Sequence, residues 1–324
     1  MFAGVFDEVF VYSIPMRLPM RNITTREGML LRRRDRWSEW SPFLEYSDAD
    51  AARWLQASLL RTDPEIRRDR IPVNVTIPVV SPRRAADLVR CSGCRTAKVK
   101  VADPNSCLED DLARLASVRA ALGDEGAVRV DANGAWSVDR AERALTAMAA
   151  YNLQYAEQPC ASVEELAELR RRLRDKQIDV PIAADESIRR AEDPYRVAEL
   201  DAADVIVLKT QPLGGWRRCV ELATDLGLPA VISSALETSV GIWAGLQAAA
   251  ALPSLDLACG LNTVKMLADD VIDQPLIATD GYLVLGERPI PSPIALLRVR
   301  ADSARQTWWR DRLNRCLALA VDKH

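Results

Sequence analysis

The fold of this chain can be predicted from one short stretch, Ala127-Val128-Arg129-Val130-Asp131, in which apolar residues lead to a carboxylate. The same design recurs at Leu153–Glu157 and at Pro181–Asp185, so the three terminal carboxylates stand 26 and 28 residues apart. Such an interval accommodates one strand plus one helix. Charges that end successive strands of a parallel barrel meet at one mouth, so we expect the three carboxylates to lie together.

Lysines occupy the units on either side of these carboxylates. One unit upstream, the stretch Ala97-Lys98-Val99-Lys100-Val101 places two lysines two residues apart. One unit downstream, Lys209 ends the apolar stretch Asp204–Leu208. Residues i and i+2 of a strand share a face, so Lys98 and Lys100 should both point into the barrel.

From Ile71 onward, short apolar stretches alternate with helical patterns, which is typical of parallel α/β architecture. The predicted strands cover residues 71–77, 96–102, 127–131, 153–157, 180–185, 204–209, 229–233 and 255–260. The predicted helices include residues 106–121, 137–150, 162–174, 215–226 and 240–251, with N-caps at Ser106, Ser137 and Ser162. Eight strands in repeated β-then-α order favour a closed TIM-type barrel. An open doubly wound sheet is the alternative, but no Gly-rich phosphate loop follows the first strand.

The segments before and after the barrel have another pattern. Residues 1–70 predict three short strands, at 5–14, 28–33 and 36–41, and a helix over 48–60 capped by Ser47. Residues 281–285 predict one more strand, and residues 304–320 an amphipathic helix. We therefore predict an α+β capping domain (1–70), a barrel (71–280) and a C-terminal segment (281–324). That segment should pack on the capping domain or at a subunit contact.

The composition excludes several classes of function. The chain has 324 residues, 48% of them hydrophobic, and a net charge of −3, which gives a large core but no footprint for nucleic acid. Asp7 and Glu8 stand where a signal peptide carries positive charge, so we do not expect the protein to be exported. The charge-free stretch 238–255 contains Ser, Thr, Gln, Gly and Pro, so we expect a buried barrel helix there rather than a membrane span. The interpretation is a cytoplasmic protein with a small-molecule carboxylate substrate, and without a nucleic-acid or membrane partner. The sequence leaves its oligomeric state open.

The positions of cysteine and histidine limit which catalytic and metal-binding groups the chain can form. Seven scattered cysteines suit a reducing cytosol, and the pair Cys91 and Cys94 has no second pair to complete a zinc site. The only histidine is His324, the last residue. Catalytic triads, Cys–His pairs and His-rich metal sites therefore do not fit, and acid–base chemistry falls to lysines and carboxylates.

Asp131, Glu157 and Asp185 form a set of three oxygen ligands. Three carboxylates without His or Cys favour Mg²⁺, or Mn²⁺, over zinc and leave positions for water and a substrate carboxylate. Asn133 and Glu186 are expected to orient these ligands or a lysine.

The two lysines of the Lys-Val-Lys stretch should influence each other. Their mutual repulsion, desolvation and a nearby metal would all lower their pKa toward the range of a general base. In this arrangement Lys100 removes the α-proton of a bound carboxylate. The metal and Lys209 then stabilise the enediolate.

These motifs resemble those of the enolase superfamily, in its muconate lactonizing enzyme subgroup. The subgroup has Lys-x-Lys on the second barrel strand, Asp, Glu and Asp on the third to fifth, and Lys on the sixth. The chain carries the complete set, at Lys98, Lys100, Asp131, Glu157, Asp185 and Lys209. The likeness extends to Arg26-Glu27-Gly28 and to residues 37–42. It implies a modified TIM barrel of (β/α)7β form with an N-terminal α+β capping domain, completed by the C-terminal segment.

Within the superfamily, the chain is most similar to the o-succinylbenzoate synthase family, through residues 94–101, 183–189 and 233–241. This resemblance implies a hydro-lyase of menaquinone biosynthesis. Such an enzyme removes water in a syn sense from 2-succinyl-6-hydroxy-2,4-cyclohexadiene-1-carboxylate, through an enediolate, to give 2-succinylbenzoate.

The same resemblance implies roles for individual residues. Lys100 would take the proton and return it to the departing hydroxyl, while Lys209 stays a cation and Lys98 tunes Lys100 and contacts the carboxylate. Ser233 and Ser234 would hold the succinyl tail. Capping loops around 15–24 and 42–46 would add specificity.

Other activities use similar apparatus. An N-succinylamino acid racemase or a muconate-cycloisomerase-like enzyme could use the same two lysines and is the main alternative. Dipeptide epimerases resemble the chain less, because residues 259–263 hold no acid for a substrate amine. The lack of an internal histidine argues against the mandelate racemase branch. A Schiff-base aldolase would leave the three carboxylates unexplained, and an inactive scaffold would be expected to have lost at least one of the six groups.

Overall fold

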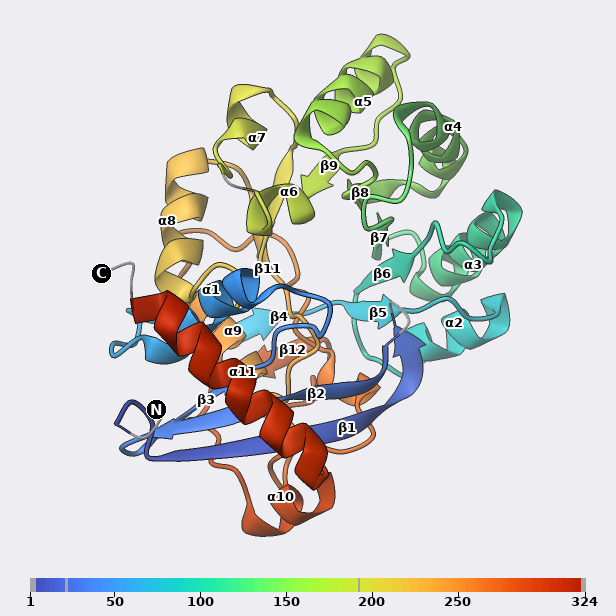
Figure 1. The fold of residues 1–324 in the computed structure, drawn as a ribbon. Helices are drawn as coiled ribbons and strands as arrows, with labels where there is room; N and C mark the ends of the chain where they lie inside the picture. Colours follow the sequence, from blue (N-terminus) through green and yellow to red (C-terminus); the bar gives the residue numbers. More distant parts are fainter. Residues whose placement is uncertain (1–3, 21–22, 192, 322–324) are drawn as a thin grey trace.

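A parallel sheet forms the centre of the molecule. The structure is a computed structural model that describes residues 4–20, 23–191 and 193–321 (Figure 1). The strands run in the order β11-β10-β9-β8-β7-β6-β5, and every adjacent pair is parallel. Their bounds are β5 (Val75–Ile77), β6 (Thr96–Lys100), β7 (Ala127–Asp131), β8 (Leu153–Glu157), β9 (Ile182–Ala184), β10 (Val205–Leu208) and β11 (Ala230–Ile232). The carboxyl ends of all seven strands therefore lie at the same end of the sheet.

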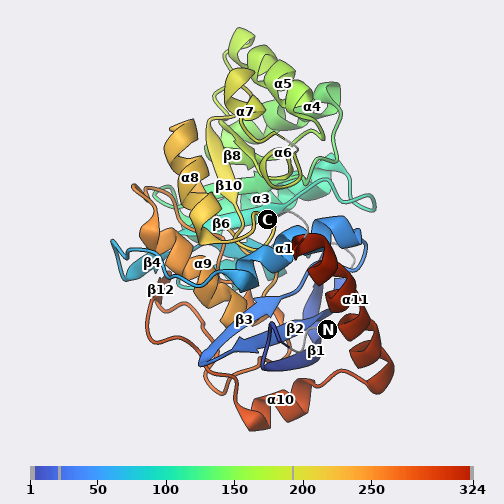
Figure 2. The ribbon, with the colours of Figure 1, turned by 60° about the vertical axis from the view of Figure 1, so that its left-hand side comes forward.

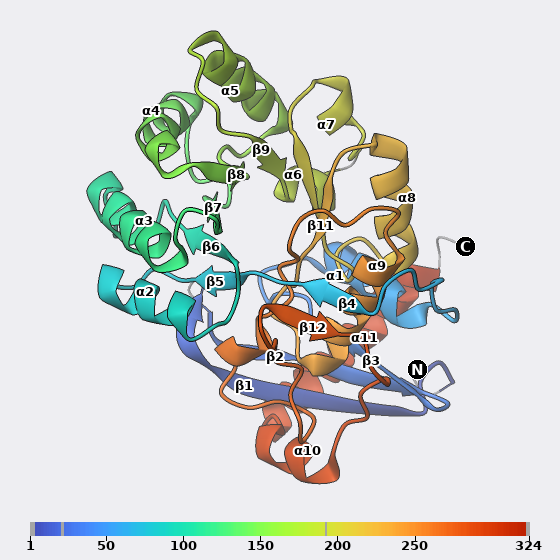
Figure 3. The same ribbon diagram turned by 180° about the vertical axis from the view of Figure 1, so that it is seen from behind.

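Helices surround this sheet, most of them on its outer face, as Figure 3 shows from behind. They are α2 (Pro82–Arg90), α3 (Leu108–Leu122), α4 (Val138–Met148), η1 (Ala149–Tyr151), α5 (Val163–Asp175), α6 (Glu186–Arg189), α7 (Arg196–Glu199), α8 (Trp216–Leu226) and α9 (Ser239–Ala251). Ser137 and Ser162 cap α4 and α5 as predicted. The predicted cap Ser106 is wrong by one residue, because Cys107 is the N-cap of α3 and its backbone N–H donates to Asp110 Oδ2 at 3.1 Å.

The predicted eighth strand, 255–260, is wrong in extent. Only Cys259 and Gly260 pair, the first beside Val73 and the second beside Ser233. The Cys259 N–H donates to the Pro72 carbonyl at 2.7 Å, and the Gly260 N–H donates to the Ile232 carbonyl at 2.8 Å. These bonds connect the two edges of the sheet, so the ring closes through two residues.

A buried arginine helps to explain why this last segment is short. The Ala258 carbonyl accepts from Arg129 Nη1 at 2.7 Å instead of from a neighbouring strand.

The predicted first strand, 71–77, is divided into two strands in the structure. Its first part, β4 (Arg70–Pro72), pairs antiparallel with β12 (Tyr282–Val284), and only its last part joins the barrel as β5.

The capping part is an antiparallel sheet with helices on it (Figure 2). It consists of β1 (Glu8–Met20), β2 (Ile23–Arg33), β3 (Arg36–Trp40) and α1 (Asp48–Leu59), in the sheet order β1-β2-β3. Helix α10 (Pro293–Val299) leads to α11 (Ser303–Val321), which packs on α1. Trp40 and Trp309 meet edge to face, with ring centroids 5.5 Å apart. The C-terminal segment thus shares a core with the first elements, while the boundaries at 70 and 280 stay predictions.

The charge-free stretch around α9 lies inside the protein. All but one of the α9 residues from Ser239 to Ala251 are buried, and the helix packs against α8, β3 and β11. Among the helices of residues 4–20, 23–191 and 193–321, none is both long and apolar enough for a membrane crossing.

A buried carboxylate joins the capping sheet to the barrel. Glu39, on β3, accepts hydrogen bonds from the Thr238 and Gly241 N–H groups at the start of α9, both at 3.1 Å. It also accepts from the Tyr12 hydroxyl at 2.7 Å. Burial and the neighbouring carboxylate of Glu237 raise the pKa of Glu39 to about 7. An anion at a helix N-terminus is favourable, but desolvation outweighs that gain here.

This carboxylate predicts a pH-dependent stability. The folded-state pKa of Glu39 lies above its ordinary value of 4.5, so the folded chain binds the proton more tightly than the unfolded chain. The stabilisation of the fold by protonated Glu39 is therefore fully present below pH 4.5 and is lost as pH rises through about 7. The free energy of unfolding should fall by about 2–3 kcal/mol more in the wild type than in Glu39→Gln between about pH 5 and about pH 8. Urea unfolding at both pH values measures this difference. An equal change in the free energy of unfolding for the two proteins would contradict the assignment.

Candidate active site

Six charged side chains lie at the carboxyl end of the barrel sheet. Lys98 and Lys100 come from β6, Asp131 ends β7 and Glu157 ends β8. Asp185 follows β9, and Lys209 follows β10. The register places Lys100 beside Asp131 and Asp131 beside Glu157, so the predicted residues of these three strands are direct neighbours.

The lysines of β6 each contact a carboxylate. Lys98 Nζ is 2.9 Å from both carboxylate oxygens of Glu157 and 3.4 Å from Asp131 Oδ2. Lys100 Nζ is 2.5 Å from Asp131 Oδ2 and 2.8 Å from Asn133 Oδ1. The predicted orienting role of Asn133 thus has a geometric basis, since its side chain contacts the second lysine.

A second group surrounds Asp185. Lys209 Nζ is 2.5 Å from Asp185 Oδ2, and Arg189 Nε is 2.9 Å from Asp185 Oδ1. Arg189 Nη2 also donates to Glu186 Oε1 at 2.5 Å, and Asn133 Nδ2 reaches the same oxygen at 3.5 Å. Asn133 and Glu186 therefore link the group at Asp185 to the group at Lys100.

Charge and burial act in opposite directions on these side chains. Burial alone would raise the pKa of Asp131, but Lys100 and Lys98 hold it well below its usual range. Burial and the neighbouring Asp131 raise the pKa of Glu157 to about 7. Burial alone would also raise the pKa of Asp185, but Arg189 and Lys209 hold it well below its usual range.

The predicted lowering of the lysine pKa values is wrong for Lys98. Burial would lower the pKa of this ammonium, but Glu157 and Asp131 outweigh it and raise the pKa. The sequence interpretation counted the second lysine, a metal and desolvation, but not the two carboxylates that contact Lys98. Lys209 was not part of that prediction; burial lowers its pKa, although Asp185 opposes the change.

The donor set fits a hard divalent cation. All the ligand atoms would be carboxylate oxygens, which Mg²⁺ and Mn²⁺ prefer. Glu157 experiences repulsion from both Asp131 and Asp185, and an added cation would relieve it. Among the residues that the structure describes, no three His, Cys, Asp or Glu side chains converge as metal ligands do. Here the carboxylates are turned toward lysine ammonium groups instead.

A cavity beside Lys100 connects the mouth to the capping part. It has a volume of about 470 Å³, and Leu18, Met20 and Val79 give it apolar walls next to Lys100 and Asn133. The first two residues come from the end of β1, within the predicted loop 15–24. Residues 21 and 22 of that loop lie outside the described part of the chain.

The other predicted substrate contacts lie nearby in the fold. Ser233 is buried after β11, and Ser234 Oγ is 2.6 Å from Thr263 Oγ1. Tyr46, from the predicted loop 42–46, accepts from Arg189 Nη1 at 2.6 Å. This last contact ties the capping part to the carboxylate group at Asp185.

Two residues of the site have no role in the sequence interpretation. Arg189 is one, although it stands in the quoted stretch 183–189. Gln158 is the other; its Oε1 accepts from the Asp185 N–H at 2.9 Å, and its Nε2 donates to Ser187 Oγ at 2.7 Å. The position of Gln158 directly after a predicted ligand was the available signal.

Replacing Arg189 with methionine should destabilise the fold strongly. The Arg189 side chain is 1% exposed and contacts Asp185 and Glu186, so its removal takes one of two cations from buried Asp185, which keeps Lys209, and breaks an ion pair of Glu186. We expect a loss of about 3–5 kcal/mol in the free energy of unfolding, measured in urea. Arg171→Met is the matched control, because Arg171 forms an exposed pair with Asp175 and should cost less than about 1 kcal/mol. Similar losses in the two variants would contradict the prediction.

Comparison with known proteins places this site in a family. Residues 81–289 match the family model described as enolase C-terminal domain-like, and residues 11–60 match the enolase N-terminal domain-like model. The o-succinylbenzoate synthase of Thermobifida fusca is 51% identical over 305 residues, which cover 93% of each chain. That of Mycolicibacterium smegmatis is 48% identical and covers 97% of each chain.

The fold comparison agrees with this assignment. The crystal structure of 2-chloromuconate cycloisomerase from Rhodococcus opacus has a TM-score of 0.74 and 22% identity, over 92% of this chain and 100% of its own. The modified TIM barrel with a capping domain, predicted from the sequence, is thereby confirmed. With these near full-length relatives, the chain belongs to the o-succinylbenzoate synthase family of enzymes within the enolase superfamily.

Proposed function

We propose that this enzyme is a metal-dependent hydro-lyase that converts 2-succinyl-6-hydroxy-2,4-cyclohexadiene-1-carboxylate to 2-succinylbenzoate. Membership of the family supports this reaction. The observation that carries it is the complete set of three lysines and three carboxylates at one end of the barrel, with the cavity beside Lys100. For the pathway that this enzyme serves, we propose menaquinone biosynthesis.

Lys100 is the proposed acid–base group. As a neutral amine it removes the proton next to the substrate carboxylate, which produces an enediolate. The resulting ammonium then gives the same proton to the departing hydroxyl, so that water leaves from the same face and the ring becomes aromatic. Asp131 and Asn133 hold the Lys100 amine in place from two sides.

Lys209 and Lys98 have supporting roles in this proposal. Lys209 is a cation that faces the enediolate and is positioned by Asp185. Lys98 stays charged because two carboxylates raise its pKa, so it contributes positive charge near the substrate carboxylate and beside Lys100. Asn133 and Glu186 connect the two lysine groups.

Asp131, Glu157 and Asp185 would hold the metal ion, for which we propose Mg²⁺ with Mn²⁺ as the alternative. When bound, the ion would neutralise the charge of the substrate carboxylate and so make its α-proton more acidic. Ser233 and Ser234 are the proposed contacts of the succinyl tail. The apolar walls at Leu18 and Met20 would exclude water from the ring.

A reducing compartment, the cytoplasm, is the proposed location. All seven cysteines lie in the described part of the chain, and all are free thiols. Unpaired cysteines are usual for proteins of the cytosol and unusual for exported ones.

One assay tests the proposed reaction. Purified protein with Mg²⁺ should consume the cyclohexadiene carboxylate, followed by the loss of its diene absorbance, and EDTA should stop the reaction until Mg²⁺ is added back. No turnover by folded protein with bound metal would overturn the proposal. Exchange of the α-proton of N-succinylamino acids in D₂O would then test the racemase alternative.

A further inference from the structure

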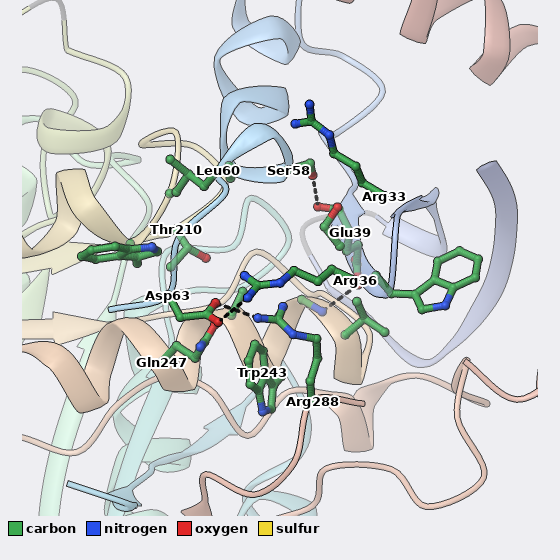
Figure 4. A pocket seen from close by; sticks show the side chains of 18 of the residues that line it. Arg33, Arg36, Glu39, Ser58, Leu60, Asp63, Thr210, Trp243, Gln247 and Arg288 are labelled. Carbon is green, nitrogen blue, oxygen red and sulfur yellow. Dashed lines mark hydrogen bonds and ion pairs between the residues drawn. The ribbon is translucent and has the colours of Figure 1, made fainter. Parts of the chain in front are cut away.

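A second cavity lies at the seam between the capping sheet and the barrel (Figure 4). Its volume is about 360 Å³, and its walls come from β3, the chain after α1, the start of α8 and helix α9. Five arginines and three acidic residues line it, so the wall carries an excess of positive charge. None of the residues with a proposed role in the reaction lines this cavity.

Two arginines in this cavity share one carboxylate. Arg36 Nη2 is 3.1 Å from Asp63 Oδ2, and Arg288 Nη2 is 2.7 Å from Asp63 Oδ1. Figure 4 shows the two guanidinium groups side by side, both directed at Asp63. Arg288 also lies over the ring of Trp243, with its guanidinium carbon 4.1 Å from the ring centroid. Asp63 is thus shared between two cations, and Asp35 acts on Arg288 as well, but the five arginines of the wall still outnumber its three acidic residues.

Two neutral polar residues, Thr210 and Gln247, line the cavity. Thr210 is 5% exposed and Gln247 is 8% exposed. Within the described ranges, neither the Thr210 hydroxyl nor the Gln247 amide makes a hydrogen bond to the protein. In the described part of the chain, neither residue has a fully buried polar atom without a partner, so both polar groups are open to the cavity and available to a ligand or ordered water there. Both residues are on the barrel side, opposite Arg36 of the capping sheet.

We propose that this cavity binds a small oxyanion, a carboxylate or a phosphate, between the capping part and the barrel. Arg36 and Arg288 supply the charge-assisted hydrogen bonds, which are the strong ones for such anions. Gln247 and Thr210 supply neutral donors from the other wall. A ligand that contacts both walls binds only the assembled fold and therefore stabilises it.

Nuclear magnetic resonance of the tryptophan side chains tests this site directly. The full-length protein with Mg²⁺, labelled with ¹⁵N, is titrated with inorganic phosphate and separately with succinate at constant ionic strength. The indole signal of Trp243, assigned with Trp243→Phe, should shift saturably with at least one of the two anions. Its Nε1 donates to the Gly286 carbonyl at 3.3 Å, so it reports on this wall. Saturation by phosphate alone or by succinate alone identifies which oxyanion the site prefers.

Matched variants separate a built site from general attraction of anions. Arg288→Gln removes a cation from the wall, and Gln247→Leu removes a donor without changing the charge. Each should weaken binding by about tenfold, while Arg83→Gln, an exposed arginine on α2, should not change it. Far-UV circular dichroism of each variant establishes that it is folded. The absence of saturation with both anions, or wild-type affinity in folded Arg288→Gln and in folded Gln247→Leu, would overturn the proposal.

Discussion

Replacing Lys100 with alanine should lower kcat/KM for the dehydration by about 10³-fold or more, because the general base is lost. The Lys100 amine stands between Asp131 and Asn133, at 2.5 and 2.8 Å, and borders the cavity of about 470 Å³. Lys98 is not a substitute. It contacts both oxygens of Glu157, and its raised pKa keeps it protonated, so it has no free electron pair for the α-proton.

The control for this variant is Lys265→Ala, which removes an exposed lysine from η2 (Val264–Met266). It should leave kcat/KM unchanged. Binding of Mg²⁺ by Lys100→Ala, measured by calorimetry, should persist because no proposed ligand is removed. If Lys100→Ala retains more than about a tenth of the wild-type rate, Lys100 is not the base.

The parts of the fold that the sequence predicts well are those with local causes. Strands β7 and β8 have the predicted bounds, 127–131 and 153–157, because each is an apolar run that ends in a carboxylate. Parallel register then brings Asp131 and Glu157 together without further information. The three carboxylates, Lys100 and Lys209 of the candidate site follow from strand order, since each stands at or directly after a strand end.

Contacts between distant parts of the chain could not be predicted in this way. Arg189 contacts Asp185 and also Tyr46, and the Tyr46 partner is 143 residues from Arg189 in sequence, so no periodic pattern indicates that contact. The raised pKa of Lys98 depends in the same way on Glu157, 59 residues away. The short eighth strand has a similar origin, because a side chain from β7 takes the Ala258 carbonyl. In each case a side chain reaches across elements whose spacing only the folded chain defines.

Replacing Glu157 with glutamine should weaken Mg²⁺ binding by about 100-fold or more and reduce turnover in parallel at a fixed metal concentration. Glu157 is 1% exposed and is the middle one of the three proposed ligands, between Asp131 and Asp185. An amide keeps the shape of this side chain but removes its charge, and a neutral oxygen is a weaker ligand for a hard divalent cation. Lys98 also loses the negative charge of the partner that it contacts at 2.9 Å. Of its two carboxylate partners, Asp131 then remains, at 3.4 Å.

Two measurements distinguish the loss of metal from the loss of the fold. Calorimetric titration with Mg²⁺ gives the affinity, and turnover as a function of Mg²⁺ concentration shows whether excess metal restores activity. We expect partial recovery at high Mg²⁺, because two carboxylates remain. Glu199→Gln, the same change at an exposed position on α7, should have wild-type affinity and turnover. Wild-type affinity in folded Glu157→Gln would remove Glu157 from the metal site, and would leave its contact with Lys98 as its only established role.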